Sequence, residues 1–187
     1  MRSLDGKILV ALPNITQGVF SKSLVFVQQS DEDGAIGFIL NKKFTPNKAK
    51  YIAQQLNIPD WHKVFYGGPT ATHTGFVLHS GDYQNNDTIQ VLDDIWFTPG
   101  GSIIEDIKAG NTPADYMLIL GHSSWAPGQL DAEMEGLPPF EASSWVTAAP
   151  DSSMFYGNQD AIRAWDFAIR QTAKERSQFI LDNFLEG

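Results

Sequence analysis

The sequence contains no cysteine. This absence excludes a disulfide framework, a zinc site built from thiolates and a cysteine nucleophile. Long apolar runs are missing as well. The apolar stretch near the N-terminus, residues 8–13, has only six residues. A signal peptide needs a longer apolar segment, and a membrane-spanning helix needs about 20 apolar residues. We therefore expect a cytoplasmic protein with no membrane segment.

Basic residues are scarce. The chain has 13 lysines and arginines against 22 aspartates and glutamates, so its formal net charge is −9. A protein that holds duplex DNA by its phosphates needs a clustered basic surface, since counterion release drives that binding. The local basic patch comprises Lys42, Lys43, Lys48 and Lys50, and we interpret it as a solvated loop and helix surface. Direct nucleic-acid binding is therefore disfavoured.

Neither an internal repeat nor a long linker divides the chain, so we expect one domain over residues 1–187. Apolar and β-branched runs separated by turn residues predict strands. Asp33-Gly34 predicts a hairpin turn between the second and third of these strands. The run at 115–120 is apolar on both faces, which is typical of a central strand. The predicted strands cover residues 7–12, 23–29, 35–40, 63–68, 74–79, 87–92, 95–98 and 115–120.

Helix signals lie between and after these strands. Thr45 is a predicted N-cap, and Ser102 with Glu105 forms a capping box for a second helix. Near the C-terminus, Asn158 is the predicted cap of one helix, and residues 175–185 form another that packs behind it. Strands come first and helices last, without regular alternation. This order predicts an α+β fold with a curved, mostly antiparallel, barrel-like sheet, flanking helices and C-terminal helices.

The stretch GHSSW at 121–125 places a serine between a strand and a helix, as in an α/β-hydrolase. The hydrolase motif is G-x-S-x-G, whereas Trp125 stands at the last position, and no histidine follows Ser123. A convergent pair of Ser123 with His79 stays open, because catalytic geometry does not depend on chain order. We favour the alternative that Ser123 or Ser124 caps the following helix.

Four sequence blocks are similar, in order and spacing, to those of the YqgE/AlgH family of bacterial proteins. The blocks read GKILVALPNI, FSKSLVFVQQSDEDGAIGFILNK, FYGGPTATHTGFVLHS and LGHSSWAPGQLDAEM, and Trp145 matches a later family tryptophan. His122 stands where the family usually has tyrosine. The resemblance implies an α+β fold around a curved, barrel-like sheet. Family members are largely uncharacterised, some carry a transcriptional-regulator label, and the resemblance supplies no agreed catalytic residues.

Polar residues and glycines of these blocks gather where predicted strands end, and such loops commonly form ligand pockets. We therefore predict a ligand or partner site, with the alternative that the glycines serve only tight turns. We predict no catalytic residue, cofactor or metal ion, since the spacing of His73 and His79 fits no zinc signature. The predicted site residues are Asn41, Lys42, Gly67, Gly68, Pro69, His79, Trp125 and Gln129.

Three functions remain to be compared. We favour a non-catalytic binding or regulatory module that acts through a protein partner or a small ligand. The alternatives are a hydrolase that uses Ser123 with His79 and a direct nucleic-acid binder. The burial of Trp125 distinguishes a ligand pocket from a purely structural turn. If the loops converge on a ligand, the Trp125 ring is partly buried and lies beside Gly68 and His79. We expect that partial burial.

Overall fold

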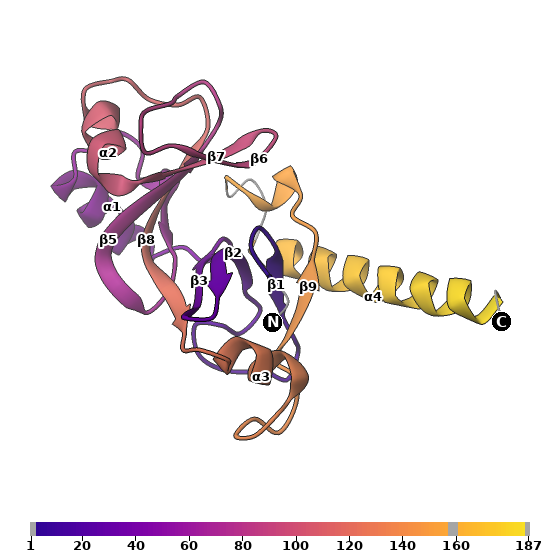
Figure 1. Ribbon diagram of the computed structural model, residues 1–187. Coiled ribbons are helices and arrows are strands. Elements are labelled where there is room, and N and C mark those ends of the chain that lie inside the picture. The colour runs from indigo at the N-terminus through magenta and orange to yellow at the C-terminus, as the bar shows by residue number, and fades with distance from the viewer. Residues whose placement is uncertain (1–2, 157–160, 186–187) are drawn as a thin grey trace.

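The computed structural model describes residues 3–156 and 161–185 (Figure 1). They form an α+β domain in which nine strands make one sheet and four α-helices lie around it. In chain order the elements are β1 (Ile8–Ala11), β2 (Leu24–Asp31), β3 (Gly34–Ile39), α1 (Pro46–Gln55), the 3-10 helix η1 (Trp61–Lys63), β4 (Val64–Tyr66), β5 (Thr70–His79), β6 (Ile89–Leu92), β7 (Ile95–Pro99), α2 (Gly100–Lys108), β8 (Tyr116–Trp125), α3 (Gln129–Glu135), β9 (Trp145–Ala148), the 3-10 helix η2 (Ser152–Met154) and α4 (Ala161–Leu185).

Strand β8 is the centre of the sheet. It pairs antiparallel with β3 and β5 and parallel with β4. The order along the sheet is β6-β7-β5-β8-β3-β2-β1-β9, with β4 beside β8. Figure 1 shows β5 bending strongly along its length. The predicted α+β class with a curved, mostly antiparallel sheet is confirmed, and the sheet is open, with β6 and β9 at its two ends.

The alternation of side chains along β8 builds two cores at once. Met117 and Ile119 lie in a core with Phe38, whereas Leu118 and Leu120 lie in a second core behind the opposite face. Successive side chains of a strand point to opposite faces, so a strand that is apolar at every position needs both faces covered. The predicted central strand over 115–120 is therefore confirmed, and it continues to Trp125.

The first forty residues form three adjacent strands, as predicted. Strand β2 pairs antiparallel with β1 on one edge and with β3 on the other. Glu32 and Asp33 form the two-residue turn between β2 and β3, and Asp31 pairs with Gly34 across it. Gly34 has φ 129°, a conformation open to glycine at little cost. The predicted hairpin is therefore present, with its turn one residue earlier than the Asp33-Gly34 pair.

The start of α1 is confirmed in position only. Thr45 occupies the N-cap and Pro46 the first helical residue, but the Thr45 side chain makes no cap hydrogen bond. The predicted capping box of α2 is wrong, because the helix already begins at Gly100 with Pro99 as its N-cap. The Ser102 hydroxyl instead accepts a hydrogen bond from the Asn85 amide. The Ser102 side chain is thus bonded to a neighbouring loop, and α2 has no side-chain cap.

The C-terminal prediction of two packed helices is wrong. A single helix, α4, runs from Ala161 to Leu185, while the predicted cap, Asn158, lies outside the described residues. The first turns of α4 pack on the sheet, where Ala168 is buried and the Trp165 indole donates to the Ala11 carbonyl at 2.7 Å. Figure 1 shows the rest of α4 extending away from the sheet. Strand β9, which pairs with β1, was not predicted.

Candidate functional site

The predicted site residues do not lie around one pocket. Trp125 is the last residue of β8, whereas His79 pairs with Tyr116, the first residue of that strand. Nine residues of strand span roughly 30 Å at about 3.3 Å per residue. Gly67 and Gly68 lie between these ends, against residues 121–123. The structure therefore places Trp125, the Gly67-Gly68 turn and His79 at different points along β8, whereas Asn41 and Lys42 follow β3 and Gln129 begins α3.

The Gly-Gly-Pro turn carries the chain across β8. Strands β4 and β5 both pair with residues 118–120 of β8, and a strand has only two edges, so they flank β8 on opposite sides. The connection through Gly67, Gly68 and Pro69 must therefore pass over β8. A Cβ atom on Gly67 would lie 2.3 Å from the Gly121 carbonyl oxygen, and one on Gly121 would lie 2.5 Å from the Gly68 oxygen. Glycine is required here by the contact of two backbones.

Asn41 and Lys42 are tied into the loops around them. The side-chain oxygen Oδ1 of Asn41 accepts a hydrogen bond from the Leu24 backbone amide at 2.8 Å, and the side-chain nitrogen Nδ2 donates to the backbone carbonyls of Lys22 and Ala161. The Lys42 ammonium donates to the Ser21 carbonyl at 2.7 Å. These bonds join the end of β3 to the segment before β2 and to the start of α4. Their geometry indicates a structural role for both side chains.

His79 is fully buried and its two ring nitrogens are both bonded. Nδ1 lies 2.9 Å from the Ser80 carbonyl, which can only accept, so Nδ1 carries the proton of the neutral ring. Nε2 lies 2.8 Å from the Thr98 hydroxyl and accepts from it. Burial lowers the pKa of His79 below its ordinary value of 6.5, against smaller opposing contributions from Ser80 and Asp82. The ring is therefore a neutral, hydrogen-bonded part of the core.

The structure does not bring Ser123 to His79. Ser123 lies seven residues along β8 from the partner of His79, which corresponds to roughly 23 Å. Ser123 is buried within the strand, and its hydroxyl faces the Gly67 carbonyl at 3.4 Å. The preferred prediction that Ser123 or Ser124 caps the next helix is also wrong. Helix α3 begins at Gln129, and its N-cap is Gly128 with φ 72°.

Trp125 belongs to an aromatic cluster beneath α3. Its ring packs against Phe20 and Trp145, and only 6% of the residue is exposed, so the prediction of partial burial is wrong. The indole nitrogens of Trp125 and Trp145 both donate to Oε2 of Glu133, at 3.2 and 2.8 Å. Gln129 donates to the other carboxylate oxygen at 2.8 Å. Glu133 thus joins α3 to the ends of β8 and β9.

Sequence reasoning missed Glu133, although a signal was present. Gln129 and Glu133 are four residues apart in a helix, and side chains at that spacing are neighbours. The two tryptophans are 20 positions apart, and only the fold shows that one carboxylate serves both. The predicted residues Trp125 and Gln129 are therefore accounted for by this cluster, which seals one end of the domain.

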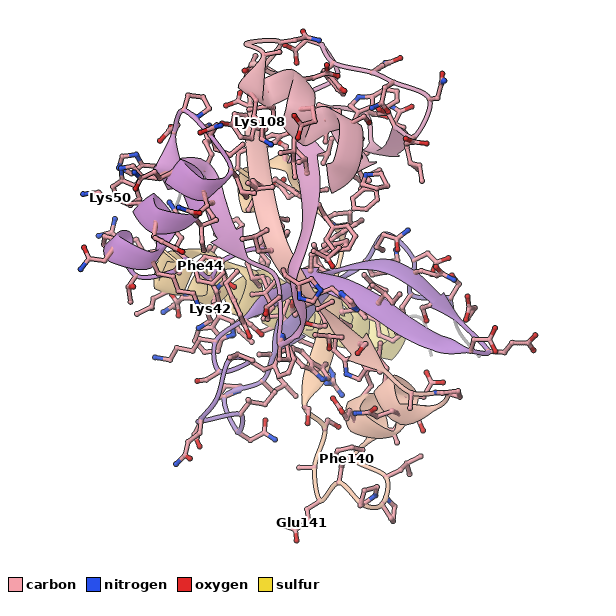
Figure 2. All side chains as sticks on the ribbon, turned by 90° about the vertical axis from the view of Figure 1, so that its left-hand side faces the viewer. Lys42, Phe44, Lys50, Lys108, Phe140 and Glu141 are labelled. Carbon is pink, nitrogen blue, oxygen red and sulfur yellow. The ribbon has the colours of Figure 1, made fainter. Side chains whose placement is uncertain are left out.

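A different part of the chain holds lysines that lie over aromatic rings; Lys48 and Lys50 are exposed, whereas Lys63 is partly buried and lies 3.7 Å from the Asp115 carboxylate. We define the lysine–aromatic face as Lys48, Lys50 and Lys63 with the rings beneath them; Lys43 also lies over a ring, that of Phe65, but on the opposite side of the extended segment from Phe44. The Nζ-to-centroid distances are 4.9 Å for Lys43 over Phe65, 4.9 Å for Lys48 over Phe44, 5.1 Å for Lys50 over Trp61 and 5.7 Å for Lys63 over Tyr116. Figure 2 shows Lys42, Phe44 and Lys50 together on the side where α1 lies.

A groove runs beside α1 within this face. Its second wall forms because β5 departs from β8: Thr70 pairs with His122 and Gly75 with Leu120, so residues 71–74 bulge outward. The groove has a volume of about 340 Å³. We refer to it as the α1 groove, and it is lined by Phe44, Lys48, Tyr51, Ile52, Gln55, Leu56, Tyr66, Thr72, His73 and Leu120.

The charge of the segment that carries the α1 groove is mainly positive. Residues 42–63 contain five lysines and one acidic residue, Asp60, in a chain of net charge −9. The Asp60 carboxylate is already engaged, since it accepts from the His62 amide at 2.9 Å and lies 2.8 Å from the His62 ring nitrogen. Three lysines of the predicted solvated patch, Lys43, Lys48 and Lys50, are exposed as predicted, and each also lies over an aromatic ring.

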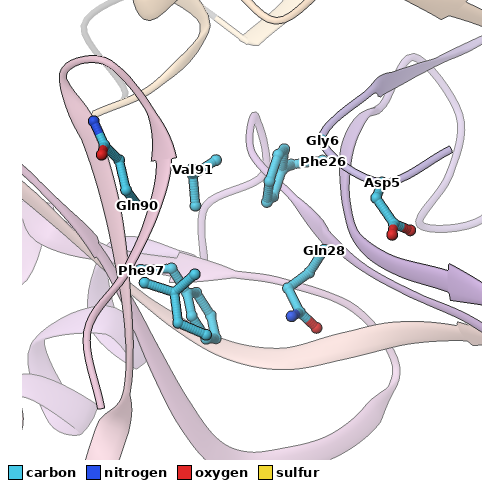
Figure 3. A pocket seen from close by; sticks show the side chains of 8 residues that line it. Asp5, Gly6, Phe26, Gln28, Gln90, Val91 and Phe97 are labelled. Carbon is cyan, nitrogen blue, oxygen red and sulfur yellow. The ribbon is translucent and has the colours of Figure 1, made fainter. Parts of the chain in front are cut away.

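A second hollow lies where the β6–β7 hairpin faces β1 and β2 (Figure 3). Its volume is about 270 Å³, and its walls are mainly Phe26, Phe97 and Val91 with the amides of Gln28 and Gln90. None of its lining residues is basic, and none is among the predicted site residues. Its chemistry is therefore less specific than that of the α1 groove.

Within residues 3–156 and 161–185, no group of three histidine, cysteine, aspartate or glutamate side chains is arranged to hold a metal ion. His73 lies on the α1 groove whereas His79 is buried at Thr98, so the two histidines do not form a pair. Among the described helices, none combines the length and apolar character that crossing a membrane requires.

The comparison with protein-family models matches residues 8–176 to the family described as AlgH-like. The chain belongs to the AlgH-like family. A UPF0301 protein of Ruegeria pomeroyi is 36% identical over 174 residues, which cover 89% of this chain and 90% of that protein. A UPF0301 protein of Rickettsia prowazekii is 37% identical over 142 residues, covering 71% and 73%. The suggested YqgE/AlgH resemblance is thereby confirmed.

Solved structures of AlgH-like fold support the same architecture. The solution structure of the AlgH protein from Pseudomonas aeruginosa has a TM-score of 0.66 at 24% identity, covering 88% of this chain and 87% of that one. A crystal structure of a Corynebacterium diphtheriae protein has a TM-score of 0.69 at 20% identity, covering 91% and 87%. At these identities the likeness concerns the fold alone.

The Glu133 cluster predicts a large loss of stability in one variant. Glu133→Ala leaves two indole donors beneath α3 without their acceptor, and hydrogen bonds to charged groups contribute about 1.5–3 kcal/mol each. We expect the free energy of unfolding in urea to fall by about 2–3 kcal/mol. Glu135→Ala removes the same charge from an exposed position of the same helix, and we expect a change within about 0.5 kcal/mol. Equal effects of the two variants would contradict the assigned role.

Burial of His79 predicts a pH dependence of stability. Its native pKa is lowered by burial, so below pH 6.5 the unfolded chain binds a proton that the native state resists. Stability contributed by this group is complete above pH 6.5 and is lost as the pH falls toward the native pKa. We expect the unfolding free energy to decrease between pH 7.5 and 5.5 by less in His79→Gln than in the wild type. Identical slopes would show that His79 protonates freely in the native state.

Proposed function

We propose that this protein is a non-catalytic binding module of the cytoplasm that regulates through an acidic protein partner, bound at the lysine–aromatic face. The observation that carries the proposal is the segregation of charge: five lysines and one acidic residue in residues 42–63 of a chain with net charge −9. A basic patch on an acidic protein favours one orientation of an acidic partner, because every other orientation brings like charges together.

The lysines of this face are already ordered. A lysine that forms an ion pair loses rotamer freedom, which opposes binding. Lys48 and Lys50 lie over aromatic rings at 4.9 and 5.1 Å, and cations are attracted to the faces of such rings. Part of the entropy loss therefore occurs on folding, and less remains to oppose association.

The two alternatives receive less support. Ser123 and His79 lie seven residues of strand apart, and both ring nitrogens of His79 are bonded, so the hydrolase pair has no geometric basis. Nucleic acid would meet a small basic area on a molecule that is otherwise strongly acidic, and phosphate binding weakens steeply with salt. A role in transcription is then exerted through the partner protein rather than through contact with DNA.

The proposal is tested with fluorescein-labelled poly-L-glutamate as a model acidic polypeptide, using fluorescence anisotropy at about 0.05 M and about 0.15 M salt. We expect Lys48→Glu with Lys50→Glu to weaken binding by about tenfold or more, because the central cations change sign. The matched control is Lys7→Glu with Lys174→Glu, two exposed lysines outside the face, which changes the net charge equally and is expected to bind like the wild type.

Equal loss of binding in the two double variants would contradict the proposal, since only net charge would then matter. Tighter binding of a duplex DNA than of poly-L-glutamate at the higher salt concentration would contradict it as well and would favour a nucleic-acid binder.

A further inference from the structure

The α1 groove differs from the rest of the lysine–aromatic face because its floor is apolar. It is lined by Ile52 of α1, by Leu56 at the C-cap of that helix and by the buried Leu120 of β8. The aromatic side chains of Phe44 and Tyr66 meet edge to face on the wall, with ring centroids 5.5 Å apart. A solvated basic surface has no need of such a floor. An apolar recess suits an apolar side chain from outside.

The rim of the α1 groove is polar and basic. Lys48 lies at one edge and its ammonium lies over the Phe44 ring. Gln55 lies on the same edge, about two turns further along α1. Thr72 and His73 form the opposite rim, on the bulge of β5. Tyr51 stands between the rims on α1 and is 62% exposed. The groove thus combines an apolar floor with a rim that can bind carboxylates.

We propose that the α1 groove seats one large apolar side chain of an acidic peptide segment, while Lys48 on its rim and Lys50, two residues further along α1, bind carboxylates next to that side chain. This inference rests on the proposed function and names the recognition element of the partner. Charge complementarity identifies the flanks as acidic. The apolar floor identifies the anchor as aromatic or leucine-like, since a few buried apolar anchors dominate such interfaces.

The openness of the groove favours a peptide over a small molecule. Sites for small ligands enclose most of the ligand surface, whereas this groove is bordered by the exposed residues Lys48, Tyr51 and Gln55 of α1. A peptide gains from one anchor side chain in the recess and from charged contacts outside it. Recognition of an apolar anchor in a groove beside a helix is a recurrent mode of peptide binding.

The test uses three fluorescein-labelled peptides of equal length. The first is a run of glutamates with a central phenylalanine, the second has alanine in place of the phenylalanine, and the third keeps the phenylalanine among lysines. We expect the first to bind the wild-type protein about tenfold or more tightly than the second, because only the first fills the recess. We expect the third not to bind.

Thr72→Trp supplies the protein variant, since Thr72 is exposed on the rim and a tryptophan there fills the recess. We expect this variant to bind the first and second peptides equally, at the wild-type affinity for the second. Thr70→Trp is not a suitable control, because Thr70 pairs with β8, whereas Thr74→Trp lies on the same bulge and outside the groove lining. Thr74→Trp should keep the preference for phenylalanine. Melting curves confirm that both variants fold.

The outcomes separate this inference from the proposed function. Equal binding of the phenylalanine and alanine peptides to the wild type overturns the anchor and leaves charge recognition in place. A phenylalanine preference that survives in Thr72→Trp also overturns the α1 groove as its site. Failure of every acidic peptide to bind overturns both the inference and the proposed function.

Discussion

The passage of residues 67–69 over β8 is the constraint on which the central part of the fold depends. The backbones of Gly67-Gly68 and of Gly121 approach too closely for a Cβ atom on any of the three glycines. This contact lets β4 pair with one edge of β8 and β5 with the other within a few residues of chain. The bulge of β5 at residues 71–74 follows directly after the passage, and it forms one wall of the α1 groove.

The same constraint explains why family-like sequence blocks surround β8. Gly67, Gly68 and Gly121 permit the passage, and Asn41 joins three loops beside it. Trp125 and Trp145 share the Glu133 carboxylate at the far end of β8. These contacts lie within the protein and need no ligand. A binding role for the predicted residues remains a proposal, and the structure supplies a structural reason for most of them.

Local patterns in the sequence predicted the strands well, because each strand is a short apolar run bounded by turn residues. The run 115–120 and the meander of residues 7–40 are examples. Features that depend on contacts with residues far along the chain could not be predicted from the sequence. Ser102 bonds to Asn85 rather than capping its helix, and β9 exists because Trp145–Ala148 pairs with β1, more than a hundred residues earlier.

The sequence contains a signal for part of the candidate site. The segments KKF, KAKY and WHK between residues 42 and 63 alternate lysine with aromatic residues, and this alternation is typical of a surface that holds its cations over rings. The α1 groove itself was not predictable, because the bulge at residues 71–74 depends on the register between β5 and β8.

The central claim is that binding takes place on the lysine–aromatic face while the residues around Gly121 to Gln129 hold the fold together. Hydrogen–deuterium exchange of the wild-type protein, with and without saturating glutamate–phenylalanine peptide, tests this claim directly. The account predicts slower exchange in residues 42–63 and in the bulge at 71–74, with unchanged exchange in residues 121–129. Slower exchange in residues 121–129 with none in 42–63 would contradict it.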